Sequence, residues 1–153
     1  MRGSEFRAEL VAALQGMVSE EVMNEDGIYW QQMTPDELRK LAASPLVTIG
    51  AHGFLHDNLG EMMPPAAIAD LLACRAFLKS AIGQEVNALA WPDGSYTRAV
   101  ADAALELGFT QQCLLDSRFP EDADDPHSEV RLGVNPFANW NNQLIAILKG
   151  TYY

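Results

Sequence analysis

Short apolar and β-branched runs alternate with amphipathic helical segments through most of the chain, and this alternation limits the fold more than any other feature. The residue pattern predicts helices over 7–17, 34–44, 64–82, 97–107 and 139–149, and strands over 46–50, 87–91, 109–115 and 130–134. Strands that alternate with helices form parallel sheets through right-handed crossovers. The sequence therefore predicts an α/β protein with parallel strands and flanking helices.

Two of these helices carry clear start and stop signals. Thr34, Pro35 and Glu37 form the pattern of a capping box with proline in the first turn. The helix over 64–82 is followed by Gly83, a residue type that commonly ends helices in the left-handed conformation. The helical spacing predicts that its core-facing side chains are Ile68, Leu71, Leu72, Phe77 and Leu78.

The charge balance excludes several classes of partner. The chain carries 10 Lys and Arg against 21 Asp and Glu, for a formal net charge of -11. Binding to nucleic acid or to an anionic membrane surface needs clustered basic residues, so neither is expected. No uninterrupted apolar run approaches the roughly 20 residues of a membrane-spanning helix. The two cysteines, Cys74 and Cys113, exclude a disulfide-rich scaffold and are expected to be buried apolar residues.

Length sets a further limit, because 153 residues suit one domain, whereas a complete (β/α)-barrel enzyme takes about 200 residues or more. Residues 1–6 read as a vector-derived leader rather than as a signal peptide, since they contain no apolar run. We therefore expect residues 7–153 to form a single incomplete domain and the chain to be a fragment. No feature of the sequence indicates a cellular compartment.

Two histidines follow the first predicted strand. His52 and His56 stand four positions apart directly after residues 46–50, and α/β folds place their sites at the carboxyl ends of strands. In a helical turn both imidazoles would lie on one face and could share a metal ion. A metalloprotease helix is excluded, because Gly53 stands where its catalytic glutamate would be. The histidines are therefore either a metal-binding pair or ordinary polar loop residues.

A second loop, Trp91-Pro92-Asp93-Gly94-Ser95-Tyr96, follows the next strand and on its own indicates only a strand-to-helix turn. Taken together, the segments resemble a known family. The stretches Met33 to Leu38, Leu46 to Leu59, Ala88 to Tyr96 and Leu107 to Thr110 have the order and spacing of polysaccharide deacetylases of the NodB-homology type, carbohydrate esterase family 4. The resemblance runs from about Trp30 to about Asn135.

The resemblance implies a partial, distorted (β/α) barrel with a divalent metal, commonly zinc, at its strand ends. In the family, two histidines and an aspartate hold the metal, and a second aspartate is the general base for attack of water on an N-acetyl carbonyl. His52 and His56 match the metal pair, and the implied substrate is a polysaccharide with N-acetylated amino sugars (or O-acetyl groups). The residues that match the substrate groove are Trp91, Pro92, Asp93, Gly94 and Tyr96.

This sequence also departs from the family pattern. The family's Thr-Phe-Asp-Asp-Gly motif has no counterpart, and Glu25-Asp26-Gly27 imitates it only superficially, in a predicted loop. Asp57 and Asp93 are then the remaining candidates for a catalytic carboxylate. Asp93 replaces an aromatic and is either a polar contact in the groove or a solvated turn residue. Gly53 replaces the usual Ser or Thr, which removes a hydroxyl but no ligand.

Further along, His127 lies in an acidic loop before a strand, whereas the family's late histidine, a general acid, ends one. The neighbouring acidic residues lack the ordered spacing of a calcium loop and are expected to be solvated; they are Glu121, Asp122, Asp124 and Asp125.

The leading hypothesis is a metal-dependent deacetylase homologue that binds its divalent metal weakly through His52 and His56 and has little or no hydrolytic activity. The alternative is a non-catalytic NodB-like module for carbohydrate binding or protein assembly. A third interpretation is an unrelated α/β domain with a chance histidine pair. Missing barrel strands would leave an unpaired sheet edge, so we also expect self-association into a dimer or swapped oligomer.

Overall fold

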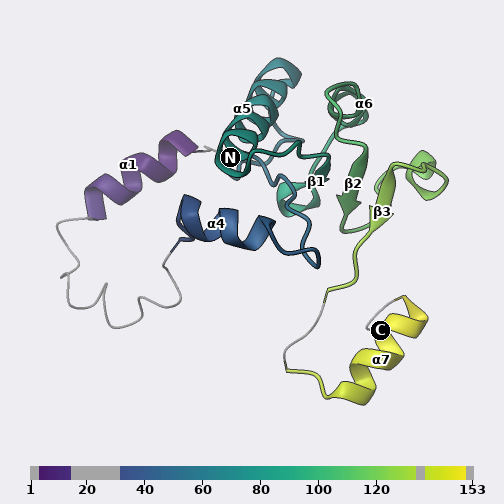
Figure 1. The fold of residues 1–153 in the computed structure, drawn as a ribbon. Coiled ribbons are helices and arrows are strands. Elements are labelled where there is room, and N and C mark those ends of the chain that lie inside the picture. The colour runs from purple at the N-terminus through teal and green to yellow at the C-terminus, as the bar shows by residue number, and fades with distance from the viewer. Residues whose placement is uncertain (1–3, 15–31, 134–136, 151–153) are drawn as a thin grey trace.

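The computed structural model describes residues 4–14, 32–133 and 137–150, and it shows the predicted alternation of strands and helices (Figure 1). The helices are α1 (Ser4–Leu14), α4 (Pro35–Ala42), α5 (Pro64–Ile82), α6 (Arg98–Glu106) and α7 (Trp140–Lys149). The strands are β1 (Ala88–Ala90), β2 (Gln111–Leu114) and β3 (Ser128–Val130), and two short 3-10 helices cover Pro92–Gly94 and Pro120–Ala123. Glu25-Asp26-Gly27 lies outside the described residues.

The strands form one parallel sheet in the order β1-β2-β3. Leu89 lies opposite Gln112, and Gln112 lies opposite Ser128. On its other edge, β1 is joined by Ala51 in a single parallel bridge to Leu89. Four consecutive segments therefore run side by side in the same direction, so their carboxyl ends meet at one edge of the sheet.

The predicted strand over 46–50 is wrong in extent, because only the backbone of Ala51 pairs with β1. Leu46, expected inside a buried strand, is 92% exposed. A strand of a parallel sheet is buried when neighbours and helices cover it. Within the described residues, this segment has β1 on one side and no strand on the other.

The last predicted strand, over 130–134, is displaced toward the amino terminus and forms as Ser128–Val130. Two hydrogen bonds show why. The Gln112 N–H donates to the His127 carbonyl at 2.6 Å, and the Arg131 N–H donates to the Leu114 carbonyl at 2.9 Å. Because β2 ends at Leu114, the described residues offer β3 no partner with which to extend its ladder further.

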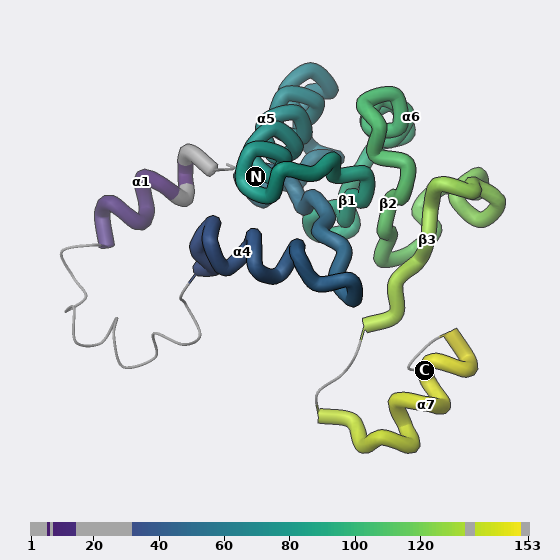
Figure 2. Tube along the Cα trace, viewed as in Figure 1, coloured from purple at the N-terminus to yellow at the C-terminus, as the bar shows by residue number. Residues whose placement is uncertain are grey.

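Helices α5 and α6 lie next to each other along the sheet (Figure 1) and contact one another. They are the two crossovers of the parallel sheet, α5 before β1 and α6 between β1 and β2, as the course of the chain in Figure 2 shows. Between helices and strands lies the core, whose fully buried members include Leu71, Leu89, Val100, Ala104, Phe109 and Leu114. The architecture is thus the expected α/β arrangement of a parallel sheet with flanking helices.

The buried face of α5 differs from the predicted one. Leu71 is fully buried and Leu78 packs against the core, but Leu72 and Phe77 are 46% and 50% exposed. The buried stripe is Ala67, Asp70, Leu71 and Cys74. Periodicity identified Leu71 but not the rest of this stripe, which contains a charged residue, Asp70, that sequence reasoning assigns to the surface.

The predicted helix ends are confirmed. The Thr34 side chain accepts the Glu37 N–H at 3.3 Å, and the Glu37 carboxylate accepts the Thr34 N–H at 2.8 Å, which completes the capping box. This backbone hydrogen bond lowers the pKa of Glu37. Gly83 ends α5 with φ 72°, the left-handed conformation that glycine adopts without steric cost. No helix in the described part of the chain is long and apolar enough to cross a membrane.

The buried face of α5 can be tested with two adjacent leucines. We predict that Leu71→Ala lowers the free energy of unfolding by about 2–5 kcal/mol, because it leaves a cavity in the core. Leu72→Ala, the matched control on the exposed side, lowers it by less than about 1 kcal/mol. Urea unfolding followed by circular dichroism measures both. Equal losses would contradict the observed orientation of α5.

Candidate functional site at the carboxyl edge of the sheet

His52 is the first residue after the Ala51 bridge, and its ring is held by the neighbouring strand. Its Nδ1 lies 2.8 Å from the carbonyl oxygen of Ala90. A carbonyl can only accept, so Nδ1 carries the proton and donates. In the neutral imidazole this leaves the lone pair on Nε2, the arrangement that metal-binding histidines adopt. His52 as a whole is exposed.

His56 lies next to His52, but not through a helical turn. The ring centroids are 4.8 Å apart and the ring planes are almost perpendicular, at 82°. Gly53 has φ 71° and His56 has φ 55°, so the backbone between them is a loop with two left-handed residues. The sequence therefore predicted the proximity of the rings correctly, whereas the helical geometry assumed for it is not the one observed.

Asp70 of α5 supports the segment between the histidines, and sequence reasoning missed it. Its Oδ1 accepts the Phe54 N–H at 2.7 Å and its Oδ2 accepts the Leu55 N–H at 3.1 Å. One turn further along α5, Cys74 lies beneath the same loop. Burial raises the pKa of the Cys74 thiol, a hydrogen bond from the His52 backbone opposes the shift, and the charge of Asp70 reinforces it.

The second loop is mostly buried, which changes the role expected for it. Trp91 is 0% exposed and Tyr96 is 2% exposed, and their rings stack at 5.4 Å. Pro92 and Gly94 are also buried, while Asp93 is exposed. In this geometry Asp93 is the groove candidate whose side chain can reach a ligand. Trp91 and Tyr96 support the loop from beneath, and this corrects the expectation that they line a groove.

Close approaches at three glycines show that the strand-end loops lie side by side. A Cβ on Gly53 would lie 3.3 Å from Cγ of Pro92, and one on Gly60 would lie 2.8 Å from the backbone nitrogen of Tyr96. A Cβ on Gly94 would lie 2.8 Å from the Leu115 side chain, beyond the end of β2. The loops that follow Ala51, β1 and β2 therefore form one continuous surface.

Polar groups at this edge include two that the described fold leaves unpaired. The indole N–H of Trp91 and Oδ1 of Asn58 are buried and have no hydrogen-bond partner among the described residues. Arg118, in the loop after β2, lies over the Tyr96 ring at 5.8 Å and reaches Oγ of Ser95 at 3.4 Å. It brings an exposed cation to a surface that otherwise carries Asp93, and no motif in the sequence pointed to it.

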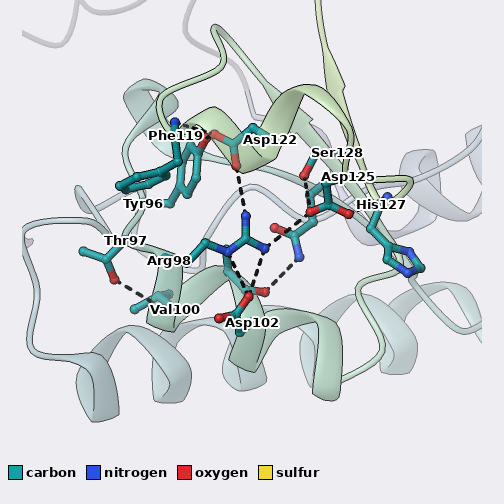
Figure 3. A network of polar contacts seen from close by, with 12 residues as sticks. Tyr96, Thr97, Arg98, Val100, Asp102, Phe119, Asp122, Asp125, His127 and Ser128 are labelled. Carbon is teal, nitrogen blue, oxygen red and sulfur yellow. Dashed lines mark hydrogen bonds and ion pairs between the residues drawn. The ribbon is translucent and has the colours of Figure 1, made fainter.

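An acidic network anchors the second loop to the chain beyond β2 (Figure 3). The Tyr96 hydroxyl donates to Asp122, whose side chain is fully buried. Asp122 also accepts the Phe119 N–H at 2.8 Å and pairs with Arg98 at 3.0 Å. Arg98 contacts Asp125 as well, at 3.4 Å. Two residues of the acidic cluster are thus structural, and the expectation that all four are solvated is wrong for Asp122.

His127 lies at the amino ends of the strands, opposite the histidine pair. Its Nδ1 is 2.9 Å from the carbonyl oxygen of Thr110, and these two residues precede β3 and β2, respectively. Because the strands are parallel, their amino ends lie opposite the edge that carries His52 and His56. His127 therefore provides an internal comparison for any property ascribed to that pair.

His52 and His56 are the candidate metal ligands that the described residues bring together. Across residues 4–14, 32–133 and 137–150, no group of three or more His, Cys, Asp or Glu side chains is arranged to hold a metal ion. A catalytic zinc ion usually has three protein ligands and a water. Asp57, which follows His56, is buried, and Asp93 is exposed at the tip of the second loop. The two imidazoles thus fit part of such a ligand set.

Fold and site define an α/β protein whose polar loops meet at the carboxyl edge of a parallel sheet. The sequence profile of the family described as polysaccharide deacetylase matches residues 14–112. That match covers more than half of the chain, which therefore belongs to the polysaccharide deacetylase family and carries a partial NodB-type domain. Among curated protein sequences, none matches significantly.

Solved structures with a similar fold include deacetylases. The Streptococcus pyogenes deacetylase PplD, solved in complex with acetate, gives a TM-score of 0.65 at 18% identity and covers 74% of this chain and 50% of its own. IcaB from Ammonifex degensii gives 0.57 at 22% identity, covering 69% of this chain and 49% of its own. The BpsB deacetylase domain from Bordetella bronchiseptica gives 0.52 at 18% identity, covering 65% and 48%. The chain thus spans about half the length of these structures.

The anchoring of Tyr96 predicts a pH dependence of stability. Burial, followed by the hydrogen bond to Asp122, raises the pKa of Tyr96 to about 12. An unfolded tyrosine titrates near about 10, so the unfolded state loses this proton first as the pH rises. The stabilisation is therefore complete below about pH 10 and is lost between about pH 10 and about pH 12.

Tyr96→Phe removes this titration. We expect the free energy of unfolding of the wild type to fall more steeply than that of Tyr96→Phe between about pH 10 and about pH 12, as measured by urea unfolding at each pH. The other tyrosines and the lysines titrate in both proteins, so the difference isolates Tyr96. Parallel curves would show that the Tyr96 hydroxyl is not held as the structure shows.

Proposed function

We propose that the carboxyl edge of the sheet is a metal-dependent deacetylase site, and that its substrate class is an acetylated polysaccharide. The observation that carries the proposal is the orientation of His52. Its Nδ1 is engaged by the Ala90 carbonyl, which leaves the lone pair of the neutral ring on Nε2, and the His56 ring lies beside it. Membership of the polysaccharide deacetylase family supports this interpretation of the pair over that of two ordinary loop residues.

His52 and His56 would supply two ligands for a divalent cation of the zinc type. Such a cation, when bound, polarises an acetyl carbonyl and lowers the pKa of water. The chain's own contribution is to fix the imidazoles: the Ala90 carbonyl sets the tautomer of His52, and the α5 carboxylate Asp70 fixes the backbone before His56. Since two ligands are fewer than a catalytic zinc site usually has, we expect weak binding by the described residues.

Substrate would approach from the side of Asp93. Asp93 has φ 54° and is exposed, and the loop that presents it is fixed from below by the stacked Trp91 and Tyr96. A carboxylate at this place can accept hydrogen bonds from sugar hydroxyls. Asp57, buried directly after His56, is the second candidate for a carboxylate that acts in the reaction.

A non-catalytic carbohydrate-binding module is the alternative. The observation in its favour is the donor set, because among the described residues no third His, Cys, Asp or Glu is arranged with the histidine pair to hold a metal ion. A binding module would keep the polar loop surface and the affinity for sugar without turnover. The two functions therefore differ in hydrolysis and in dependence on the histidines.

Zinc titration by calorimetry, together with deacetylation of an N-acetylglucosamine oligomer, tests the proposal. We expect weak zinc binding that His52→Ala reduces at least about tenfold, and little turnover. His127→Ala, which changes a histidine at the opposite edge, should leave zinc binding unchanged. Equal affinities for wild type and His52→Ala would contradict the metal site. Robust turnover lost in His52→Ala would overturn the expected inactivity and assign the missing carboxylate to Asp57 or Asp93.

We also propose that the chain self-associates through its open sheet edge. Beyond Ala51 no further strand is present among the described residues, and Leu46 on this side is highly exposed. Unpaired edges and exposed apolar groups favour pairing with another chain. With a net charge of -11, repulsion opposes association, so added salt should strengthen it.

Light scattering over a range of protein and salt concentrations measures this association. We expect dimers or larger oligomers in the wild type, more of them at high salt, and fewer in Leu46→Asp. Leu72→Asp, an equal change on exposed α5 surface, is the control. A monomer at high concentration and high salt would contradict the proposal.

A further inference from the structure

We propose that Asp70 is a positioning residue for the histidine pair, and that it holds the two imidazoles together through the backbone of the loop between them. The inference rests on the proposed function only where it concerns metal binding. Asp70 itself touches neither ring in the contacts described above; it binds the N–H groups of Phe54 and Leu55 at 2.7 and 3.1 Å.

Because Asp70 is buried, its carboxylate depends on these two hydrogen bonds. Asp70 is 8% exposed, and a buried carboxylate is costly unless hydrogen bonds compensate the lost hydration. Its two oxygens each accept one of two consecutive backbone N–H groups. The carboxylate thus uses both oxygens on one short segment, which fixes the direction of the chain between His52 and His56.

The segment that Asp70 holds is unfavourable without such support. His56 adopts φ 55°, a left-handed conformation that is sterically unfavourable for a residue other than glycine. His56 follows directly on the two residues whose N–H groups bind Asp70. The two hydrogen bonds to Asp70 therefore stabilise the backbone conformation in which the centroid of the His56 ring lies 4.8 Å from that of His52.

The loop also lies close to Asp70 at Gly53, where a larger residue would be strained. A Cβ on Gly53 would lie 3.2 Å from Oδ1 of Asp70 and 3.3 Å from Cγ of Pro92, and Gly53 has φ 71°. A side chain at this position would push the loop away from α5. Gly53→Ala should therefore disturb the histidine pair from the loop side, as Asp70→Asn does from the helix side.

The primary experiment measures ring geometry without metal. In the wild type we expect nuclear Overhauser contacts between the His52 and His56 rings, and slow amide exchange of Phe54 and Leu55. Asp70→Asn retains the side-chain shape but replaces one acceptor with a donor. We expect it to lose the ring contacts and to speed both exchanges at least about tenfold. Glu106→Gln, an equal charge change on exposed α6 surface, should change neither.

A second measurement adds zinc alone and follows its affinity. We expect Asp70→Asn to bind about 10–100-fold more weakly than wild type and Glu106→Gln to bind equally. A merely structural role would lower the unfolding temperature without selectively separating the two rings. If Asp70→Asn does not fold, Gly53→Ala decides by the same ring contacts and the same zinc affinity.

The outcomes separate this inference from the proposed function. Ring contacts that persist in Asp70→Asn, or that are absent from the wild type, overturn the inference. So does zinc affinity that is equal in the wild type and in a variant with loosened rings. Ring contacts that depend on Asp70 in a wild type that binds no zinc uphold the positioning role and overturn the proposed metal site.

Discussion

The short ladder between Ala51 and β1 is the interaction on which the site depends. The Ala51 N–H donates to the Ala88 carbonyl at 2.8 Å, and the Ala90 N–H donates to the Ala51 carbonyl at 2.9 Å. His52 then continues the ladder with its side chain, since its Nδ1 binds the Ala90 carbonyl. One backbone bridge thereby fixes where the chain leaves the sheet, which ring nitrogen of His52 is hydrogen-bonded, and how the polar loops meet.

Buried carboxylates then hold the loops that leave this edge. Asp70 secures the histidine loop from α5, and Asp122 secures the Trp91–Tyr96 loop through Tyr96, Phe119 and Arg98. Each carboxylate is buried and each is compensated by donors, two for Asp70 and three for Asp122, as burial of charge requires. In an acidic chain these residues look like solvated surface, yet they fix the geometry of the site.

Local residue patterns and the family resemblance were enough to predict much of the fold and one part of the site. The capping box at Thr34, the bounds of α5, the alternation of elements and the adjacency of His52 and His56 were all predictable. The extent of the strand before His52 was not, because pairing depends on neighbours that residue type does not encode. The role of Asp70 was not predictable because a periodicity argument treats a carboxylate as exposed. Trp91 and Tyr96 were predicted to line a groove because their burial depends on tertiary packing, which the sequence pattern does not show.

The central claim is that the carboxyl edge, and no other part of the described structure, presents imidazole nitrogens to a divalent cation. Long-range proton–nitrogen spectra of the three histidines during a zinc titration test it most directly. The account predicts that the ring signals of His52 and His56 shift together, with Nε2 of His52 changing most, while those of His127 remain unchanged. Shifts of His127 alone, or equal shifts of all three rings, would contradict it.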